Sequence, residues 1–246
     1  MNFFVTGGSR GLGEAIVLEA VKQGHDVAFT YNKGADQAKK VVAVAKDLAP
    51  KQKVIAYQCD QRSSANVEEV GNRVLDDFDT IHAVVANAGI NINGLAANYD
   101  DEDWKTVIDT NLSGSFYVVR HFLGTMVANR YGRIVFVSSL GAYGVTGQAC
   151  YATTKAGLMG LSQSLAKEYG KRGITSNVVA PGFFDTDMTR EGMSDFNREF
   201  WTKYCPLGRI GDPKECASVV LFLASDGAAF VNGQTINITG GLDWAP

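Results

Sequence analysis

The chain has 246 residues, 46% of them hydrophobic, and a formal net charge of −3. Such a length suits one or two domains with a sizeable buried core. Basic and acidic residues are interspersed without a long run of either sign, which argues against nucleic acid or an anionic membrane as a partner.

Residue types that bind metals or act as nucleophiles are scattered. The four cysteines form no C-x-x-C pair, and the three histidines are far apart in the sequence. Zinc chemistry and Ser-His-Asp catalysis therefore have little support, and we expect no metal site. No signal peptide precedes the first predicted strand, and no apolar run is long enough to span a bilayer. A reducing, cytoplasmic setting is the expectation that follows.

The beginning of the chain has the pattern of a nucleotide-binding βαβ unit. Residues 2–6 predict a strand, residues 12–23 a helix and residues 26–31 a second strand. The first turn is glycine-rich and reads Thr6-Gly-Gly-Ser-Arg-Gly-Leu-Gly13. Glycine lets a backbone approach a pyrophosphate, and a helix N-terminus offers unpaired N–H donors. An ordinary tight turn is the alternative, but the position at the first strand–helix junction favours a nucleotide. The residues expected to line this site are Gly7, Ser9, Arg10, Gly11, Leu12 and Gly13.

The end of the second strand bears on which dinucleotide binds. An acidic residue there would accept a hydrogen bond from the ribose 2′-hydroxyl of NAD and repel a 2′-phosphate. Tyr31, Asn32 and Lys33 occupy the position instead. Arg10 and Lys33 could pair with a 2′-phosphate, so we expect NADPH rather than NADH. In the alternative reading, both cations are simply solvated.

Two further strand ends carry candidate ligand contacts. Residues 54–59 predict a strand that Asp60 follows. This carboxylate could bind an adenine amino group or cap the next helix, and the two readings are about equally good. Residues 81–86 predict a fourth strand, followed by Asn87, Ala88 and Gly89, where small residues would let the backbone lie against a ligand. Helices are expected at residues 36–48 and 67–78.

A long helix is expected at residues 104–130, with Asn111 in its middle. An asparagine is mildly unfavourable inside a helix and usually faces water there. The next strand, residues 132–139, ends in Ser138 and Ser139. Another helix then begins with Tyr151 in its first turn, and Lys155 lies four residues further on, on the same helix face.

The pair of Tyr151 and Lys155 predicts acid–base chemistry. A neighbouring cation favours the ionised form of a phenol, so the pKa of Tyr151 should fall toward the working range of a general acid or base. Taken alone, Y-x-x-x-K is common, and a chance pair on a helix is the alternative. The other motifs of the chain make a functional pair the better reading.

The last third predicts a strand at residues 174–180, which leads into a loop that starts at Pro181 and Gly182. Residues 190–210 are the least regular part and mix aromatic with polar side chains. A mobile lid over an apolar substrate and a surface helical hairpin packed on the body are equally good readings. A helix at 213–225 and a strand at 235–238 follow.

We see no internal repeat and no linker in the sequence. Residues 1–246 are therefore expected to form a single dinucleotide-binding and catalytic domain. Its expected fold is α/β and Rossmann-type, with a doubly wound parallel sheet of about seven strands and helices on both faces.

The order of these motifs resembles that of the short-chain dehydrogenase/reductase family, and within it the 3-oxoacyl-[acyl-carrier-protein] reductases. The similarity covers nearly the whole chain, and together the motifs are very specific. The matching pieces are the glycine-rich turn, residues 87–89, Asn111, Ser138, Tyr151 with Lys155, Pro181 with Gly182, and the segments 206–211 and 233–241.

The resemblance implies roles for several residues. Tyr151 would protonate a carbonyl oxygen as hydride arrives from the nicotinamide. Lys155 would hold the nicotinamide ribose and lower the pKa of Tyr151. A serine would hydrogen-bond the carbonyl, and Asn111 would hold a water that links Lys155 to solvent. Phe184 would lie by the nicotinamide amide and Thr186 by the phosphates. This is general-acid catalysis on a clamped oxygen.

Two ways of counting give different catalytic serines. The family's usual spacing of thirteen residues before Tyr151 lands on Ser138. Counting forward along the strand from Gly132 lands on Ser139, because the connection is one residue shorter than the common pattern. We expect Ser138, since the spacing to Tyr151 serves the chemistry.

The resemblance also implies a partner and an assembly. Carrier-protein reductases of the family use a basic patch beside the active-site mouth, and Arg130 and Arg172 stand at similar positions. Ordinary surface cations are the alternative. We expect an acyl-carrier protein or acyl-CoA substrate, and a homotetramer formed through the helices near Trp104 and Tyr151 and the C-terminal strand.

The expected activity is the NADPH-dependent reduction of a 3-oxoacyl thioester to the 3-hydroxyacyl thioester, in fatty-acid, polyketide or polyene synthesis. One alternative is the same chemistry on a free small molecule such as an acyl-CoA, a sugar, a steroid or a quinone. A catalytically idle binding subunit is a third reading. The presence of Asn111, Ser138, Tyr151 and Lys155 argues against it.

Overall fold

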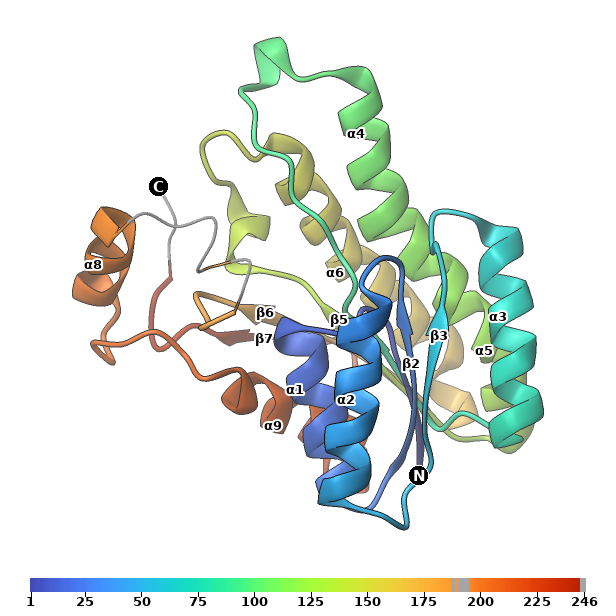
Figure 1. Ribbon diagram of the computed structural model, residues 1–246. Coiled ribbons are helices and arrows are strands. Elements are labelled where there is room, and N and C mark those ends of the chain that lie inside the picture. The colour runs from blue at the N-terminus through green and yellow to red at the C-terminus, as the bar shows by residue number, and fades with distance from the viewer. Residues whose placement is uncertain (187–188, 190–194, 244–246) are drawn as a thin grey trace.

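Seven parallel strands form one sheet in the computed structural model, which describes residues 1–186, 189 and 195–243 (Figure 1). The strand order is β3-β2-β1-β4-β5-β6-β7, and every neighbouring pair is parallel. The strands are β1 (Asn2–Val5), β2 (Asp26–Tyr31), β3 (Val54–Gln58), β4 (Ala83–Ala86), β5 (Gly132–Val137), β6 (Ile174–Pro181) and β7 (Thr235–Ile238).

Helices cover both faces of this sheet (Figure 1). One face carries α1 (Gly11–Lys22), α2 (Ala35–Leu48) and α9 (Pro213–Ala224). The other face carries α3 (Ser64–Phe78), α5 (Gly114–Asn129) and α6 (Ala149–Tyr169). Every residue of β5 and β6 is buried, because both faces of the sheet are covered. The predicted doubly wound α/β fold is confirmed.

Within the described ranges, no helix combines the length and the apolar character needed to cross a membrane.

The strand order fixes where the functional residues meet. From β1 the chain adds β2 and β3 on one side, and from β4 it adds β5, β6 and β7 on the other. A parallel sheet in which the order of strand addition reverses in this way has a crevice at the carboxyl ends of its strands, where ligands bind. The glycine-rich turn after β1 and residues 87–89 after β4 lie at this crevice.

The long helix expected at residues 104–130 is divided into three parts. Helix α4 (Asp101–Ile108) runs into a π-helical turn (Asp109–Ser113), and α5 begins after it. In the π turn, the N–H of Gly114 donates to the carbonyl of Asp109, five residues back rather than four. Such turns are rare and often occur at functional positions.

Residues 190–194 of the expected lid lie outside the described residues. The described part includes α8 (Asp195–Tyr204), where the ring of Trp201 stacks on that of Phe183 with centroids 4.3 Å apart. Trp201 is also buried against Leu140 and Leu242. Helix α8 is therefore packed on the body, and a hairpin over the whole segment stays a prediction. A lid function for residues 190–210 stays a prediction.

Candidate active site

The glycine-rich turn after β1 is held against the turn after β4. Thr6 Oγ1 accepts hydrogen bonds from the N–H groups of Asn87 and Ala88, at 3.0 and 2.9 Å. Gly7 has a φ of 66°, and a Cβ there would come within 3.0 Å of the Ala88 Cα. A Cβ on Gly13 would collide with the carbonyl oxygen of Gly7. Glycine at both positions thus lets the start of α1 lie close to the crevice.

The loop after β6 returns to this turn. A Cβ on Gly11 would stand 3.6 Å from the Cβ of Thr186, which places Thr186 beside the start of α1. The ring of Phe184 is only 5% exposed and belongs to the core cluster. A contact between Phe184 and a nicotinamide stays a prediction. Pro181 and Gly182 lead the chain out of β6, as expected.

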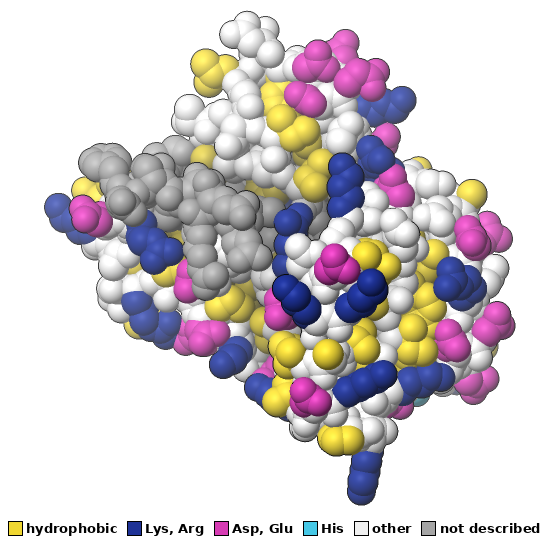
Figure 2. Space-filling view, viewed as in Figure 1, with side chains coloured by type: hydrophobic (Ala, Val, Ile, Leu, Met, Phe, Trp, Pro, Cys, Tyr) yellow, Lys and Arg dark blue, Asp and Glu magenta, His cyan; other side chains and the backbone are white. Residues whose placement is uncertain are grey.

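The segment at the end of β2, from Tyr31 to Lys33, contains no acidic residue. Tyr31 is half-buried, whereas Asn32 and Lys33 are exposed. Arg10, the residue before α1, is exposed as well, next to the buried Ser9. On the face drawn in Figure 2, Lys and Arg side chains lie near the middle, beside the grey segment, with an acidic side chain among them. Binding of a 2′-phosphate by Arg10 and Lys33 stays a prediction.

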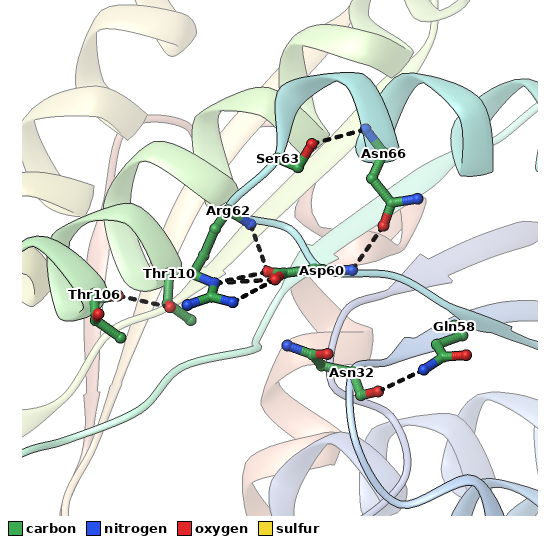
Figure 3. Close-up of polar contacts among 8 residues, drawn as sticks. All are labelled: Asn32, Gln58, Asp60, Arg62, Ser63, Asn66, Thr106 and Thr110. Carbon is green, nitrogen blue, oxygen red and sulfur yellow. Dashed lines mark hydrogen bonds and ion pairs between the residues drawn. The ribbon is translucent and has the colours of Figure 1, made fainter.

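Asp60 lies at the carboxyl end of β3 and pairs with Arg62 (Figure 3). The closest approach is 2.5 Å, between Asp60 Oδ2 and Arg62 Nη2, and the hydrogen bond with Arg62 lowers the pKa of Asp60. The cap of α3 is Ser63, whose hydroxyl accepts from the N–H of Asn66 at 3.2 Å. The reading of Asp60 as the helix cap is therefore wrong, and adenine binding by Asp60 stays a prediction.

Asn111 is fully buried, which corrects the expectation that it faces water. Its Oδ1 accepts from the N–H of Ile90 at 2.8 Å, and its Nδ2 donates to the Ile90 carbonyl at 2.9 Å and to Thr154 Oγ1 at 3.1 Å. A Cβ on Gly89 would stand 3.3 Å from both Asn111 Oδ1 and Lys155 Nζ. Asn111 thus links the turn after β4 to α6, the helix that carries Tyr151 and Lys155.

Tyr151 and Lys155 lie together in the first turns of α6. The ammonium of Lys155 is 5.6 Å from the centre of the Tyr151 ring and donates to the carbonyl of Val137 at 2.7 Å. Burial lowers the pKa of Lys155 to about 8. The sequence predicted that the cation would lower the pKa of Tyr151, but burial raises it, while a hydrogen bond with Ser139 acts in the opposite direction. Loss of hydration outweighs the hydrogen bond with Ser139 here.

The two serines after β5 face different ways. Ser138 is buried, and its hydroxyl donates to the main-chain carbonyl of Lys155 at 2.8 Å. The hydroxyl of Ser139 hydrogen-bonds Tyr151 and accepts from the N–H of Gly141 at 3.0 Å. The geometry therefore favours Ser139 over the expected Ser138. Successive side chains of an extended segment point in opposite directions, so only one of the two serines can face Tyr151.

Arg130 and Arg172 are neighbours, and both are exposed; Arg130 Nη2 donates to the carbonyl of Lys171 at 3.3 Å. They precede β5 and β6, however, whereas Tyr151 follows β5. The length of a six-residue strand, roughly 20 Å, separates the two edges. The expected basic patch thus does not lie beside the active-site mouth of its own chain.

Sequence reasoning missed Gln61, which is buried between the predicted adenine loop and the π turn. Its amide donates to the carbonyl of Thr110 at 2.6 Å. The available signal was a polar residue directly after Asp60, at the carboxyl end of a strand.

A family model described as enoyl-(acyl carrier protein) reductase matches residues 7–243. With the motifs and the sheet described above, this match shows that the chain belongs to the short-chain dehydrogenase/reductase family. The membership makes the protein an oxidoreductase that acts on a ketone or the corresponding alcohol, and it implies a nicotinamide cofactor.

Individual relatives are similar to nearly the whole chain. The 3-oxoacyl-[acyl-carrier-protein] reductase FabG of Staphylococcus epidermidis RP62A is 39% identical over 239 residues, which are 97% of each chain. The reductase of the same name from Escherichia coli K12 is 40% identical over 248 residues, covering 98% of this chain and 99% of the relative. A crystal structure of levodione reductase superposes with a TM-score of 0.93 at 29% identity, covering 98% of this chain and 96% of the other.

The buried ammonium of Lys155 makes a testable contribution to stability. Its pKa of about 8 lies below the ordinary value of 10.5, so the folded state loses this proton before the unfolded chain does. Folding therefore carries the full cost of the buried charge below about pH 8, and the cost is relieved between pH 8 and 10.5. We expect Lys155→Met to raise the free energy of unfolding at neutral pH, by an amount that shrinks as the pH rises through this window.

Urea unfolding at a series of pH values measures the effect. Lys167→Met is the matched control, because Lys167 is exposed on the same helix and should show no such trend. A Lys155→Met protein that is less stable than wild type at neutral pH would contradict the expected cost of the buried charge.

Proposed function

We propose that the protein reduces a carrier-protein-bound 3-oxoacyl thioester to the 3-hydroxyacyl thioester with NADPH, in fatty-acid, polyketide or polyene synthesis. The observation that carries the proposal is the hydrogen bond between Ser139 and Tyr151 beside the buried ammonium of Lys155. The choice of substrate rests on the FabG relatives, whose names specify a 3-oxoacyl-carrier-protein reductase.

The residues at the crevice fit a nicotinamide dinucleotide. Gly7, Gly11 and Gly13 bring the start of α1 to the crevice with little side-chain bulk, and Thr186 stands beside it. Residues 87–89 offer a second flat stretch of backbone at the end of β4. When bound, the nicotinamide supplies the hydride that reduces the carbonyl carbon.

Ser139 and Tyr151 together clamp the ketone oxygen of the substrate. Both hydroxyls can donate to one acceptor, and negative charge develops on that oxygen as the carbon is reduced. Tyr151 then gives its proton to the oxygen, and Ser139 orients the oxygen through its hydrogen bond. Burial keeps the Tyr151 hydroxyl protonated until this step, because it raises the pKa of Tyr151.

Lys155 restores the proton on Tyr151. With a pKa of about 8, its ammonium stays charged at neutral pH and can release a proton more readily than an exposed lysine. The side chain of Asn111 is already committed to Ile90 and Thr154. A water that links Lys155 to solvent would therefore bind the Asn111 main-chain carbonyl, which can accept a second bond besides that from the Ser115 hydroxyl.

The reduction assay follows NADPH absorbance with four substrates: acetoacetyl-carrier protein, acetoacetyl-CoA, crotonyl-CoA and a free cyclic ketone. Faster turnover of the carrier-protein ketone is the expected result. Crotonyl-CoA tests the enoyl reduction that the family model's description names. A preference for the free ketone would replace the proposed substrate, and no turnover of any ketone would favour an idle binding subunit.

The serine assignment makes a direct prediction. Ser139→Ala should lower kcat/KM by about 10²- to 10³-fold, the usual loss when one donor to a developing oxyanion is removed. Ser138→Ala removes a buried bond to the Lys155 carbonyl, so it should lower stability while keeping most of the turnover. Steady-state kinetics and thermal melts of both variants provide the measurement. A severe loss of turnover in Ser138→Ala with near-normal Ser139→Ala would reverse the assignment.

The preference for NADPH makes a second prediction. Replacing Arg10 and Lys33 together by Ala should raise the KM for NADPH by roughly 10- to 100-fold, as expected when charge-assisted bonds to a phosphate are lost. The KM for NADH should change little. Lys39→Ala is the control, because Lys39 is exposed on α2 and pairs with Asp36. Equal effects on both cofactors would mean that these cations do not read the 2′-phosphate.

The proposal also covers the oligomeric state of the protein and its location in the cell. Large apolar side chains are exposed on α4 and α5, at Trp104 and Phe116, and beyond α9 at Phe230. These surfaces support the predicted homotetramer, and light scattering would test it. A cytoplasmic location stays a prediction.

A further inference from the structure

The π turn before α5 changes the hydrogen bonding of a carbonyl near the catalytic residues. In a regular α-helix, the N–H of Gly114 would donate to the carbonyl of Thr110, four residues earlier. Here it donates to Asp109 instead. The Thr110 carbonyl thereby loses the donor that a regular helix would supply, next to the buried Asn111.

Gln61 supplies a donor to that carbonyl. Its Nε2 lies 2.6 Å from the Thr110 oxygen and 3.4 Å from the carbonyl of Ala88. The side chain is buried, so water has little access to replace it. Gly114 makes the approach possible, because a Cβ at that position would stand 2.8 Å from both the Gln61 Cγ and the Gln61 carbonyl oxygen.

Asp60 and Arg62, the sequence neighbours of Gln61, lie at the predicted adenine end of the cofactor site. Asp60 and Arg62 form the ion pair at the end of β3, and Asp60, with a smaller contribution from Asp109 of the π turn, raises the pKa of Arg62. Figure 3 shows this pair beside the turn that carries Thr110. The segment 60–62 thus contacts the π turn through a buried amide, and the charge of Arg62 also interacts weakly with that of Asp109.

We propose that Gln61 is a positioning residue for the reaction proposed above. Its amide stabilises the π turn that directs Asn111 toward Ile90 and Thr154, and so fixes the surroundings of Lys155. Without this donor, the Thr110 carbonyl would be satisfied only in a regular α-helical turn, where the N–H of Gly114 donates to it. The extra residue of the π turn would then be lost, and Asn111 would turn away from α6.

The test compares two substitutions that differ in their ability to donate. Gln61→Met has nearly the same shape but offers no donor, whereas Gln61→Glu can donate only when its carboxyl is protonated. Gln234→Met is the matched control, because Gln234 also donates to a main-chain carbonyl, that of Asn232 at 2.9 Å, but on the surface. Three quantities are measured: kcat at saturating NADPH and acetoacetyl-CoA as a function of pH, the Kd for NADPH by fluorescence, and hydrogen exchange of peptides covering 105–118.

The expected result is selective. Gln61→Met lowers kcat by about 10-fold or more, the scale of loss that follows a small misplacement of the catalytic groups, while the Kd for NADPH changes by less than about threefold. The kcat of Gln61→Glu relative to wild type rises as the pH falls, whereas that of Gln61→Met does not. Hydrogen exchange becomes faster in residues 109–114 of Gln61→Met, and Gln234→Met behaves like wild type.

Two results would overturn the inference. One is a normal kcat in Gln61→Met; the other is a parallel loss of kcat, NADPH affinity and melting temperature, which would indicate a general structural role. A wild-type protein that reduces no ketone would instead remove the proposed function. Exchange at residues 109–114 would then decide on its own whether Gln61 stabilises the π turn.

Discussion

The hydrogen bond from the buried ammonium of Lys155 to the carbonyl of Val137 is the interaction on which the site depends. It places a positive charge at the carboxyl end of β5, under the ring of Tyr151 and away from water. A charge in this position is costly unless it is hydrogen-bonded, and burial brings its pKa down to about 8. The group is therefore still charged at neutral pH and close to the point at which it releases a proton.

The loops that surround this charge come from different strands, and buried polar bonds tie them together. Thr6 joins the turn after β1 to the turn after β4, Asn111 joins the π turn to both the turn after β4 and α6, and Ser138 joins the end of β5 to α6. Loops are ordinarily the mobile part of a domain. Here Thr6, Asn111 and Ser138 each have specific partners, so the reacting groups are set in place before a substrate arrives.

The sequence was most informative where periodicity and glycine chemistry decide the structure. Asp26–Tyr31 and Thr235–Ile238 were predicted at both ends, because apolar strands between turn signals are distinctive. Tyr151 and Lys155 came together because helical spacing alone brings them to one face. The glycine-rich turn stood out in the sequence, and the structure gives the reason for two of its glycines: Gly7 has a positive φ, and a Cβ on Gly13 would collide with the Gly7 carbonyl.

The sequence was least informative where a tertiary contact overrides a local rule. Asn111 is buried because Ile90 and Thr154 satisfy its amide, and neither partner is visible from helical spacing. The choice of Ser139 required the direction of each side chain after β5, which a count back from Tyr151 does not contain. Arg130 and Arg172 were expected at the active-site mouth from the family resemblance alone, whereas both precede the strands whose carboxyl ends form the crevice.

The central claim is that the Tyr151 hydroxyl delivers the proton to a ketone oxygen. The most direct measurement is turnover of acetoacetyl-carrier protein by Tyr151→Phe, which removes one oxygen atom and keeps the ring, together with the Kd for NADPH. The account predicts a loss of turnover of at least about 100-fold with NADPH binding retained, as expected for removal of a general acid. Turnover close to that of the wild type would contradict it.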